Sequence, residues 1–106
     1  MTEKKGTKCF YSEYVNHMVR FYITCPDVLT IKGKKRADLE NWIAVQGVLH
    51  WLPAEDREKV LRIYRTDPNL LKAVHKYCLE TGESNEQIWV LISAVSAKIA
   101  RRRGLI

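Results

Sequence analysis

A chain of 106 residues, 46% of them hydrophobic, is long enough for one domain with its own core and too short for a separate catalytic domain. Eighteen Lys and Arg residues against twelve Asp and Glu residues give a formal net charge of +6, which favours nucleic acid or another acidic surface as the partner. No run of about 18 apolar residues could cross a bilayer, and the start of the chain lacks the apolar core of a signal peptide, so we expect no membrane association.

The first ten residues are polar and rich in lysine, and we expect residues 1–10 to form a flexible basic tail ahead of a helical domain over residues 11–106. A basic arm that enters a DNA minor groove is the alternative interpretation of this tail. Apolar and aromatic residues at helical spacing then predict a helix over residues 12–24, with its aromatic stripe in the core. Pro26 ends it, because the residue before a proline disfavours helical geometry.

The next segment, residues 27–36, is a connector with a basic tip formed by Lys34, Lys35 and Arg36. A single short β-branched run within it has no partner strand elsewhere, so no sheet is predicted. The basic tip could contact phosphate or could be an ordinary solvated loop, and both interpretations stay open.

Three further helices are predicted over residues 37–52, 54–66 and 68–81. The first of them is apolar around much of its circumference, which indicates a central position in the fold. Asp67 is expected to cap the third, with Pro68 at the first helical position, where a proline loses no hydrogen bond.

The last predicted helix covers residues 84–103, and both of its ends are well marked. Ser84 can cap it by accepting from a backbone N–H, and Gly104 is a natural stop. One face is apolar at the three-and-four spacing of a helix, at Ile88, Leu91, Ile92, Val95 and Ile99. Five helices with short connections indicate an all-α, single-domain bundle.

No arrangement of residues predicts catalysis. His17, His50 and His75 lie on three different predicted helices without a convincing partner at metal-ligand spacing, so we interpret them as surface residues. The chain has no phosphate-binding glycine loop, no nucleophile elbow and no HExxH motif, so no enzyme, cofactor or metal site is predicted. Its three cysteines are an odd count without CxxC spacing, which indicates a reducing, cytoplasmic setting rather than a disulfide framework.

Residues 68–103 have the layout of a helix-turn-helix, the motif that places its second helix in the DNA major groove. Around the turn glycine, Gly82, this motif needs a small residue four positions before and an apolar residue six positions after. Cys78 and Ile88 meet these needs. Glu83 departs from the pattern, because an apolar residue is usual there.

If this motif is formed, the exposed side of its second helix contacts base edges, and the basic residues contact phosphates. The predicted DNA-binding residues are Ser84, Asn85, Gln87, Trp89, Ser93, Lys98, Arg101, Arg102 and Arg103, with Lys34, Lys35 and Arg36 of the connector.

From Leu52 onward the chain resembles region four of sigma factors, in its Leu-Pro-Ala-Glu-Asp-Arg stretch ending at Tyr64, in Gly82-Glu-Ser84 and in residues 88–99. It is also similar to short sigma-like and late-gene regulators of phages and integrated elements of Gram-positive bacteria. The resemblance implies a DNA-binding transcription regulator that reads double-stranded DNA with residues 84–101 and has RNA polymerase as a further partner.

A second hypothesis comes from Trp89 and Val90, which are unusually apolar for a base-reading face. An exposed apolar face favours a small mobile-element protein that binds another protein, as an inhibitor or adaptor of a host nucleic-acid machine, or that forms a homodimer. The distribution of charge distinguishes the two. Basic residues that share one surface with the last helix favour DNA, whereas scattered basic residues beside a bare apolar patch favour protein binding.

Overall fold

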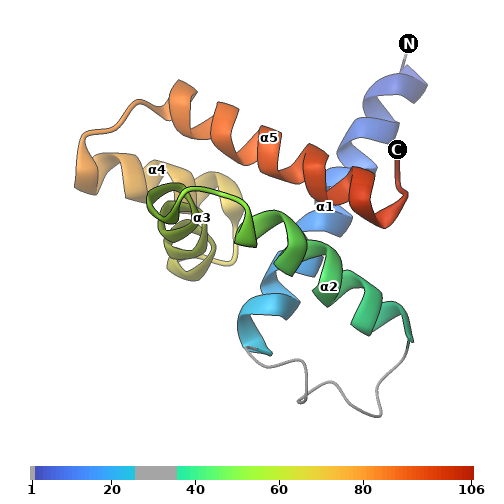
Figure 1. The fold of residues 1–106 in the computed structure, drawn as a ribbon. Coiled ribbons are helices and arrows are strands. Elements are labelled where there is room, and N and C mark those ends of the chain that lie inside the picture. Colours follow the sequence, from blue (N-terminus) through green and yellow to red (C-terminus); the bar gives the residue numbers. More distant parts are fainter. Residues whose placement is uncertain (1, 26–35) are drawn as a thin grey trace.

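The computed structural model describes the backbone of residues 2–25 and 36–106, and the side chains from residue 11 onward within those ranges. The described residues form five α-helices and no strand, which confirms the predicted all-α bundle. In chain order the helices are α1 (Thr2–Thr24), α2 (Arg36–His50), α3 (Ala54–Thr66), α4 (Leu70–Thr81) and α5 (Asn85–Arg103) (Figure 1).

Helix α5 runs along the molecule from the α4 end to the α2 end (Figure 1). It packs against α4 near its beginning and against α1 and α2 further along, while α3 packs mainly on α4. Helices α1 and α5 each contact three other helices. Helix α2 packs on α1 and α5 and supplies four buried residues to the core, so it is buried on one side and not around much of its circumference.

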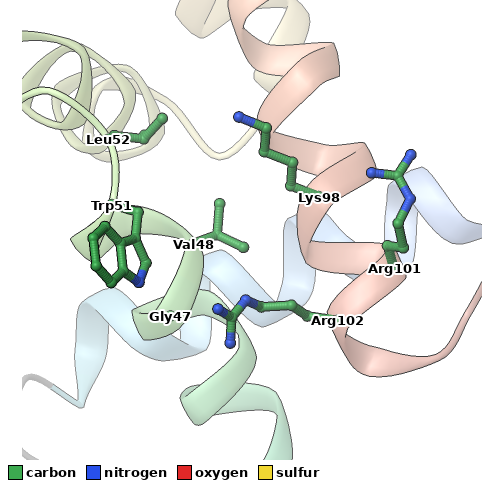
Figure 2. A pocket seen from close by; sticks show the side chains of 7 residues that line it. All are labelled: Gly47, Val48, Trp51, Leu52, Lys98, Arg101 and Arg102. Atoms are coloured by element: carbon green, nitrogen blue, oxygen red, sulfur yellow. The ribbon is translucent and has the colours of Figure 1, made fainter.

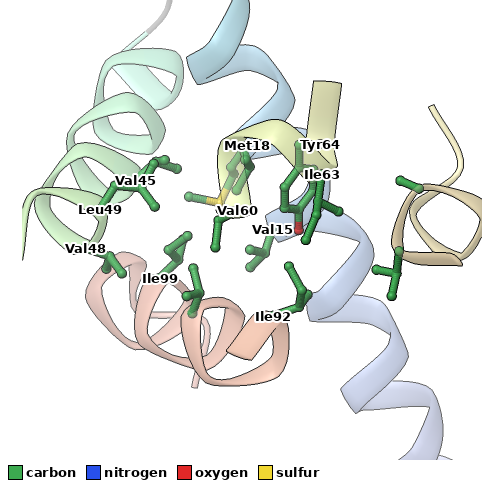
Figure 3. Packing of buried hydrophobic residues seen from close by; sticks show 14 of the residues in the cluster. Val15, Met18, Val45, Val48, Leu49, Val60, Ile63, Tyr64, Ile92 and Ile99 are labelled. Carbon is green, nitrogen blue, oxygen red and sulfur yellow. The ribbon is translucent and has the colours of Figure 1, made fainter. Parts of the chain in front are cut away.

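The core lies where the five helices converge, and Figure 3 shows its side chains pointing toward one another. Each helix supplies residues at three-and-four spacing, as the sequence predicted for α3 and α5. The largest fully buried side chains are Met18, Leu49, Ile63, Ile99, Val15, Val19, Val45, Val60 and Val74.

Polar contacts hold α1 against the end of α3. The guanidinium of Arg20 donates to the backbone oxygens of Tyr64 at 3.0 Å and Asp67 at 3.1 Å, which satisfies carbonyls that the helix end leaves without partners. The Tyr64 hydroxyl donates to Asn16 Oδ1 at 2.6 Å. Burial raises the pKa of Tyr64 to about 12, although the nearby Arg20 charge lowers it in part.

Helix α1 begins at Thr2 rather than at Ser12, so most of the segment predicted as a tail is helical backbone. Once the later turns of α1 are anchored in the core, each added residue extends an existing helix instead of starting a new one, which costs little. The connector that carries Lys34 and Lys35 lies outside the described residues, and Arg36 is the first residue of α2.

The predicted start of α4 was also wrong. Its cap is Asn69, whose side chain accepts from the backbone N–H of Lys72 at 3.0 Å, and not Asp67. The Asp67 carboxylate is occupied elsewhere, because it accepts from the Asn69 backbone N–H and from Lys76 Nζ, both at 2.8 Å. These two bonds lower the pKa of Asp67, with the Lys76 bond as the larger cause.

Several apolar side chains that the periodicity placed toward the core are exposed instead. The exposed fractions are 51% for Ile43 on α2, 78% for Trp51 directly after α2, and 68% for Leu71 on α4. The cause on α2 is that α1 and α5 cover only one side of it, where Ala44, Val45, Val48 and Leu49 are buried.

A buried leucine, Leu49, and an exposed leucine, Leu79, allow the packing of this core to be tested. We expect Leu49→Ala to lower the free energy of unfolding by about 2 to 5 kcal/mol, because it leaves a cavity among fully buried neighbours. The matched variant Leu79→Ala, on a side chain that is 72% exposed, should change it by no more than about 0.5 kcal/mol. Chemical denaturation followed by circular dichroism measures both, and equal losses would contradict the packing.

Candidate nucleic-acid interface

A groove lies between the end of α2 and the end of α5. Its cavity volume is about 440 Å³. Figure 2 shows Lys98, Arg101 and Arg102 extending from α5, with Arg102 reaching toward α2. We name this site the basic groove; its lining residues are Gly47, Val48, Trp51, Leu52, Lys98, Arg101 and Arg102.

Helix geometry explains why the three cations lie together. Positions 98, 101 and 102 are neighbours on one side of α5 because they are spaced by three and four residues. The adjoining side of the same turns is buried, with Ile99 fully enclosed. All three cations therefore lie beside the core at the basic groove, and of them Arg102 reaches toward α2 (Figure 2).

Gly47 lets Arg102 lie directly against α2. A Cβ atom at position 47 would be only 2.6 Å from Arg102 Nη1 and 2.9 Å from its Cζ, closer than such atoms normally approach. The guanidinium also lies in the last turn of α2, where the partial negative charge of the helix end favours a cation. This placement fixes one charged group at the wall of the groove.

The basic groove has an unbalanced positive charge. Within residues 11–25 and 36–106, Lys98, Arg101 and Arg102 form no ion pair or side-chain hydrogen bond, and no acidic residue lines the groove. On the α2 side, Trp51 exposes 78% of its surface. Three cations beside an exposed indole form a site suited to an anionic ligand that also has an aromatic or apolar part.

Arg103 and Arg36 do not belong to this site. Arg103 Nε donates to Asn41 Oδ1 at 2.6 Å, and its Nη1 lies 3.4 Å from a Glu40 carboxylate oxygen. Arg36 pairs with the same Glu40 at 3.0 Å. Because Asn41 Nδ2 also donates to the Tyr14 hydroxyl at 3.1 Å, Arg103 ties α5 to α2 and α1.

The predicted base-reading residues face other neighbours. Asn85 and Trp89 line a cavity of about 510 Å³ against α4, together with Leu71, Lys72, His75 and Lys76. Trp89 and Ser93 line another, of about 330 Å³, against α1. The predicted DNA-contacting residues are thus divided between the side of α5 that faces α1 and α4 and the side that faces α2.

Near the turn, Ser84 accepts from the Gln87 backbone N–H at 3.4 Å and caps α5, as predicted, and the Gln87 side chain is exposed. Gly82 has a φ of 79°, in the left-handed region that glycine adopts without strain. Cys78 and Ile88 are both buried, so the small and apolar positions of the motif are occupied as its pattern requires.

Glu83, which departs from the pattern, has a structural role of its own. Its carboxylate accepts from the Tyr77 hydroxyl at 2.6 Å and from Lys59 Nζ at 2.9 Å, so it joins α3, α4 and the turn. The Tyr77 bond first, and then the Lys59 bond, lower the pKa of Glu83. Burial first, and then the Glu83 bond, raise the pKa of Tyr77 to about 12.

Sequence reasoning missed Trp51 and Gly47 as parts of a site. Trp51 was grouped with the apolar residues of a helix expected to be buried on most sides. A signal was present, because positions 39, 43, 47 and 51 follow one another at intervals of four and so form a stripe beside the buried face. Which partner covers such a stripe cannot be read from spacing.

The described residues contain no group of three or more His, Cys, Asp or Glu side chains that could hold a metal ion. His17, His50 and His75 are all exposed, as predicted. No described helix is long and apolar enough to span a membrane.

Because of the Glu83 contacts, we expect the stability of the folded protein to decrease at acid pH. The pKa of Glu83 is lower in the folded protein than its ordinary value of 4.5, so its contribution is present above that value and is lost as pH falls through the lower, folded pKa. We expect Glu83→Gln to be less stable than the parent protein at pH 7 and to lose less stability below pH 4.5. Denaturation at several pH values measures this.

The control is Glu80→Gln, which removes the same charge from an exposed pair with Arg62. Because exposed pairs contribute little, it should affect stability less than Glu83→Gln does. If the two variants follow the same curve of stability against pH, the Glu83 contacts do not contribute in solution.

Comparison with known proteins does not assign the chain to a family. No protein-family model, curated protein or solved structure matches the chain. A role for the basic groove therefore depends on its own charge, shape and exposed side chains.

Proposed function

We propose that this protein is a DNA-binding transcription regulator that contacts the phosphate backbone through the basic groove. The observation that carries the proposal is the convergence of Lys98, Arg101 and Arg102 on one groove without an acidic partner among the described residues. The formal net charge of +6 acts in the same direction, because it attracts a polyanion over a longer range.

The chemistry of the three side chains suits phosphate. An arginine guanidinium presents paired N–H donors that match two phosphate oxygens, and a lysine ammonium adds a mobile point charge. Each phosphate that is neutralised releases condensed counterions, which drives binding at low salt and makes it sensitive to salt.

A finer form of the proposal takes α4, the turn at Gly82 and α5 as a helix-turn-helix. The buried Cys78 and Ile88 and the left-handed Gly82 support it. In this form Asn85 and Gln87, whose side chains are exposed, are the residues available to contact base edges. Trp89 is less suited, because it is partly buried and packs against the core.

Protein binding is the second candidate function, and a specific observation favours it. Leu71, Leu79 and Val90 expose 68%, 72% and 65% of their surfaces on α4 and α5. Large apolar side chains mark a surface that meets another protein when they gather in one patch, and the partner would be RNA polymerase, another host protein or a second copy of this chain.

The test is fluorescence anisotropy of a labelled mixed-sequence duplex across a range of salt concentrations. Replacing both Arg101 and Arg102 with Ala should weaken binding to all sequences and reduce the slope of log affinity against log salt by about 2, since each lost phosphate contact removes about 1. Replacing Arg62 and Arg65 with Ala is the control, because both are exposed cations of α3 that line neither the basic groove nor the cavity beside Asn85.

Equal losses in the two double variants would mean that net charge, and not the groove, drives association. An absence of duplex binding by the parent protein at low salt would overturn the DNA proposal. A variant with Leu71, Leu79 and Val90 replaced by Ser would then be tested beside the parent protein. Under the protein-binding function, the variant should no longer form the complex with its partner protein that the parent forms.

A further inference from the structure

Trp51 is the feature of the basic groove that phosphate binding does not explain. The residue exposes 78% of its surface, the largest value among the exposed large hydrophobic residues described. Its ring meets His50 edge-on, at 5.7 Å between ring centroids, so the indole has a neighbour that limits its rotation. It lies across the groove from the α5 cations.

From this arrangement we propose that the basic groove binds single-stranded nucleic acid, with one unpaired base stacked on Trp51 and the flanking phosphates on Lys98, Arg101 and Arg102. The proposal rests on the proposed nucleic-acid-binding function and names the form of the ligand. Proteins that bind single strands combine the same two elements, a positively charged groove along the backbone and an aromatic side chain for the bases.

Stacking requires a base whose face is open. In a duplex both faces of each base are covered by the neighbouring base pairs, and a side chain in a groove meets only base edges. An unpaired base can turn out of the strand and place its face on an indole. Trp51 is therefore of use to a single strand and of little use to an intact duplex.

The size and lining of the groove fit this ligand. Its volume of about 440 Å³ lies within the range of roughly 300 to 1,000 Å³ that holds small organic ligands, so a single base with its sugar can enter. Val48 and Leu52 supply an apolar floor beside Trp51. The cations are at the α5 side, where the charged backbone of the strand would pass (Figure 2).

An acidic peptide with aromatic side chains is the alternative ligand, but the residues that line the basic groove suit it less well than a nucleotide strand. A bound peptide needs partners for its backbone N–H and C=O groups, which are costly to leave without hydrogen bonds. Apart from the Trp51 indole N–H, the side chains of the groove are either cationic or apolar. A base stacked on Trp51 places its apolar face on the indole and keeps its polar edges in the solvent, while the cations contact the phosphates of the strand.

The experiment uses the full chain and a labelled mixed-sequence strand of about 12 nucleotides, a length within the site sizes of single-strand binders. The same sequence as a duplex and a polyglutamate peptide are titrated in parallel. The variants are Trp51→Ala, Trp51→Phe and the control Ile43→Ala, which shortens an exposed apolar residue of α2 outside the groove.

We expect Trp51→Ala to weaken single-strand binding about 5- to 150-fold, the loss that corresponds to one stacked base, without changing the salt slope, because no phosphate contact is lost. Trp51→Phe should recover part of the affinity, since a phenyl ring still stacks. Duplex binding should be unaffected by either, and Ile43→Ala should leave both affinities unchanged. Circular dichroism checks that each variant is folded.

The outcomes separate this inference from the function on which it depends. If neither strand nor duplex binds, both the proposed function and this inference fail. If the strand binds and the duplex does not, the duplex-binding regulator is overturned and this inference stands. If the duplex binds at least as tightly as the single strand and Trp51→Ala changes neither, the function stands and this inference is overturned. Tighter binding of polyglutamate than of the strand would also overturn it, in favour of an acidic protein segment.

Discussion

The burial of one face of α5 is the constraint on which the rest of this structure depends. Ile88, Ile92, Val95 and Ile99 are all nearly inaccessible, and they meet α4 at one end and α1 and α2 at the other. A helix of 19 residues that is fixed along most of its length cannot rotate about its axis. The position of each exposed residue around the α5 axis, relative to the buried face, therefore decides on which side of the molecule the residue lies.

This assignment decides what the basic end of α5 can do. Lys98, Arg101 and Arg102 are directed into a groove with α2, whereas Arg103, one position later, turns back to Asn41 and Glu40. Four cations that look equivalent in a sequence thus have two roles. Three are available to a ligand, and one holds the end of α5 in place.

In the turn between α4 and α5, Glu83 occupies a position that is usually apolar in a helix-turn-helix. Glu83 accepts from Tyr77 and from Lys59, so the turn is joined to both preceding helices by charge-assisted hydrogen bonds. Hydrogen bonds of this kind are directional, and they hold the turn in one geometry where an apolar residue would hold it by packing. They also make the turn sensitive to acid, because the carboxylate must stay ionised to accept both bonds.

The sequence by itself determined the all-α class, the bounds of the helix over residues 54–66 and the Ser84 cap of the last helix, because periodicity and capping depend on residues that are close along the chain. It also predicted that Lys98, Arg101 and Arg102 lie in the last turns of a helix. Only the tertiary structure decided that Trp51 stands beside them, since residues so far apart in sequence meet through the packing of α2 on α5. The same packing covers one side of α2 and leaves the other exposed, which no local pattern specifies.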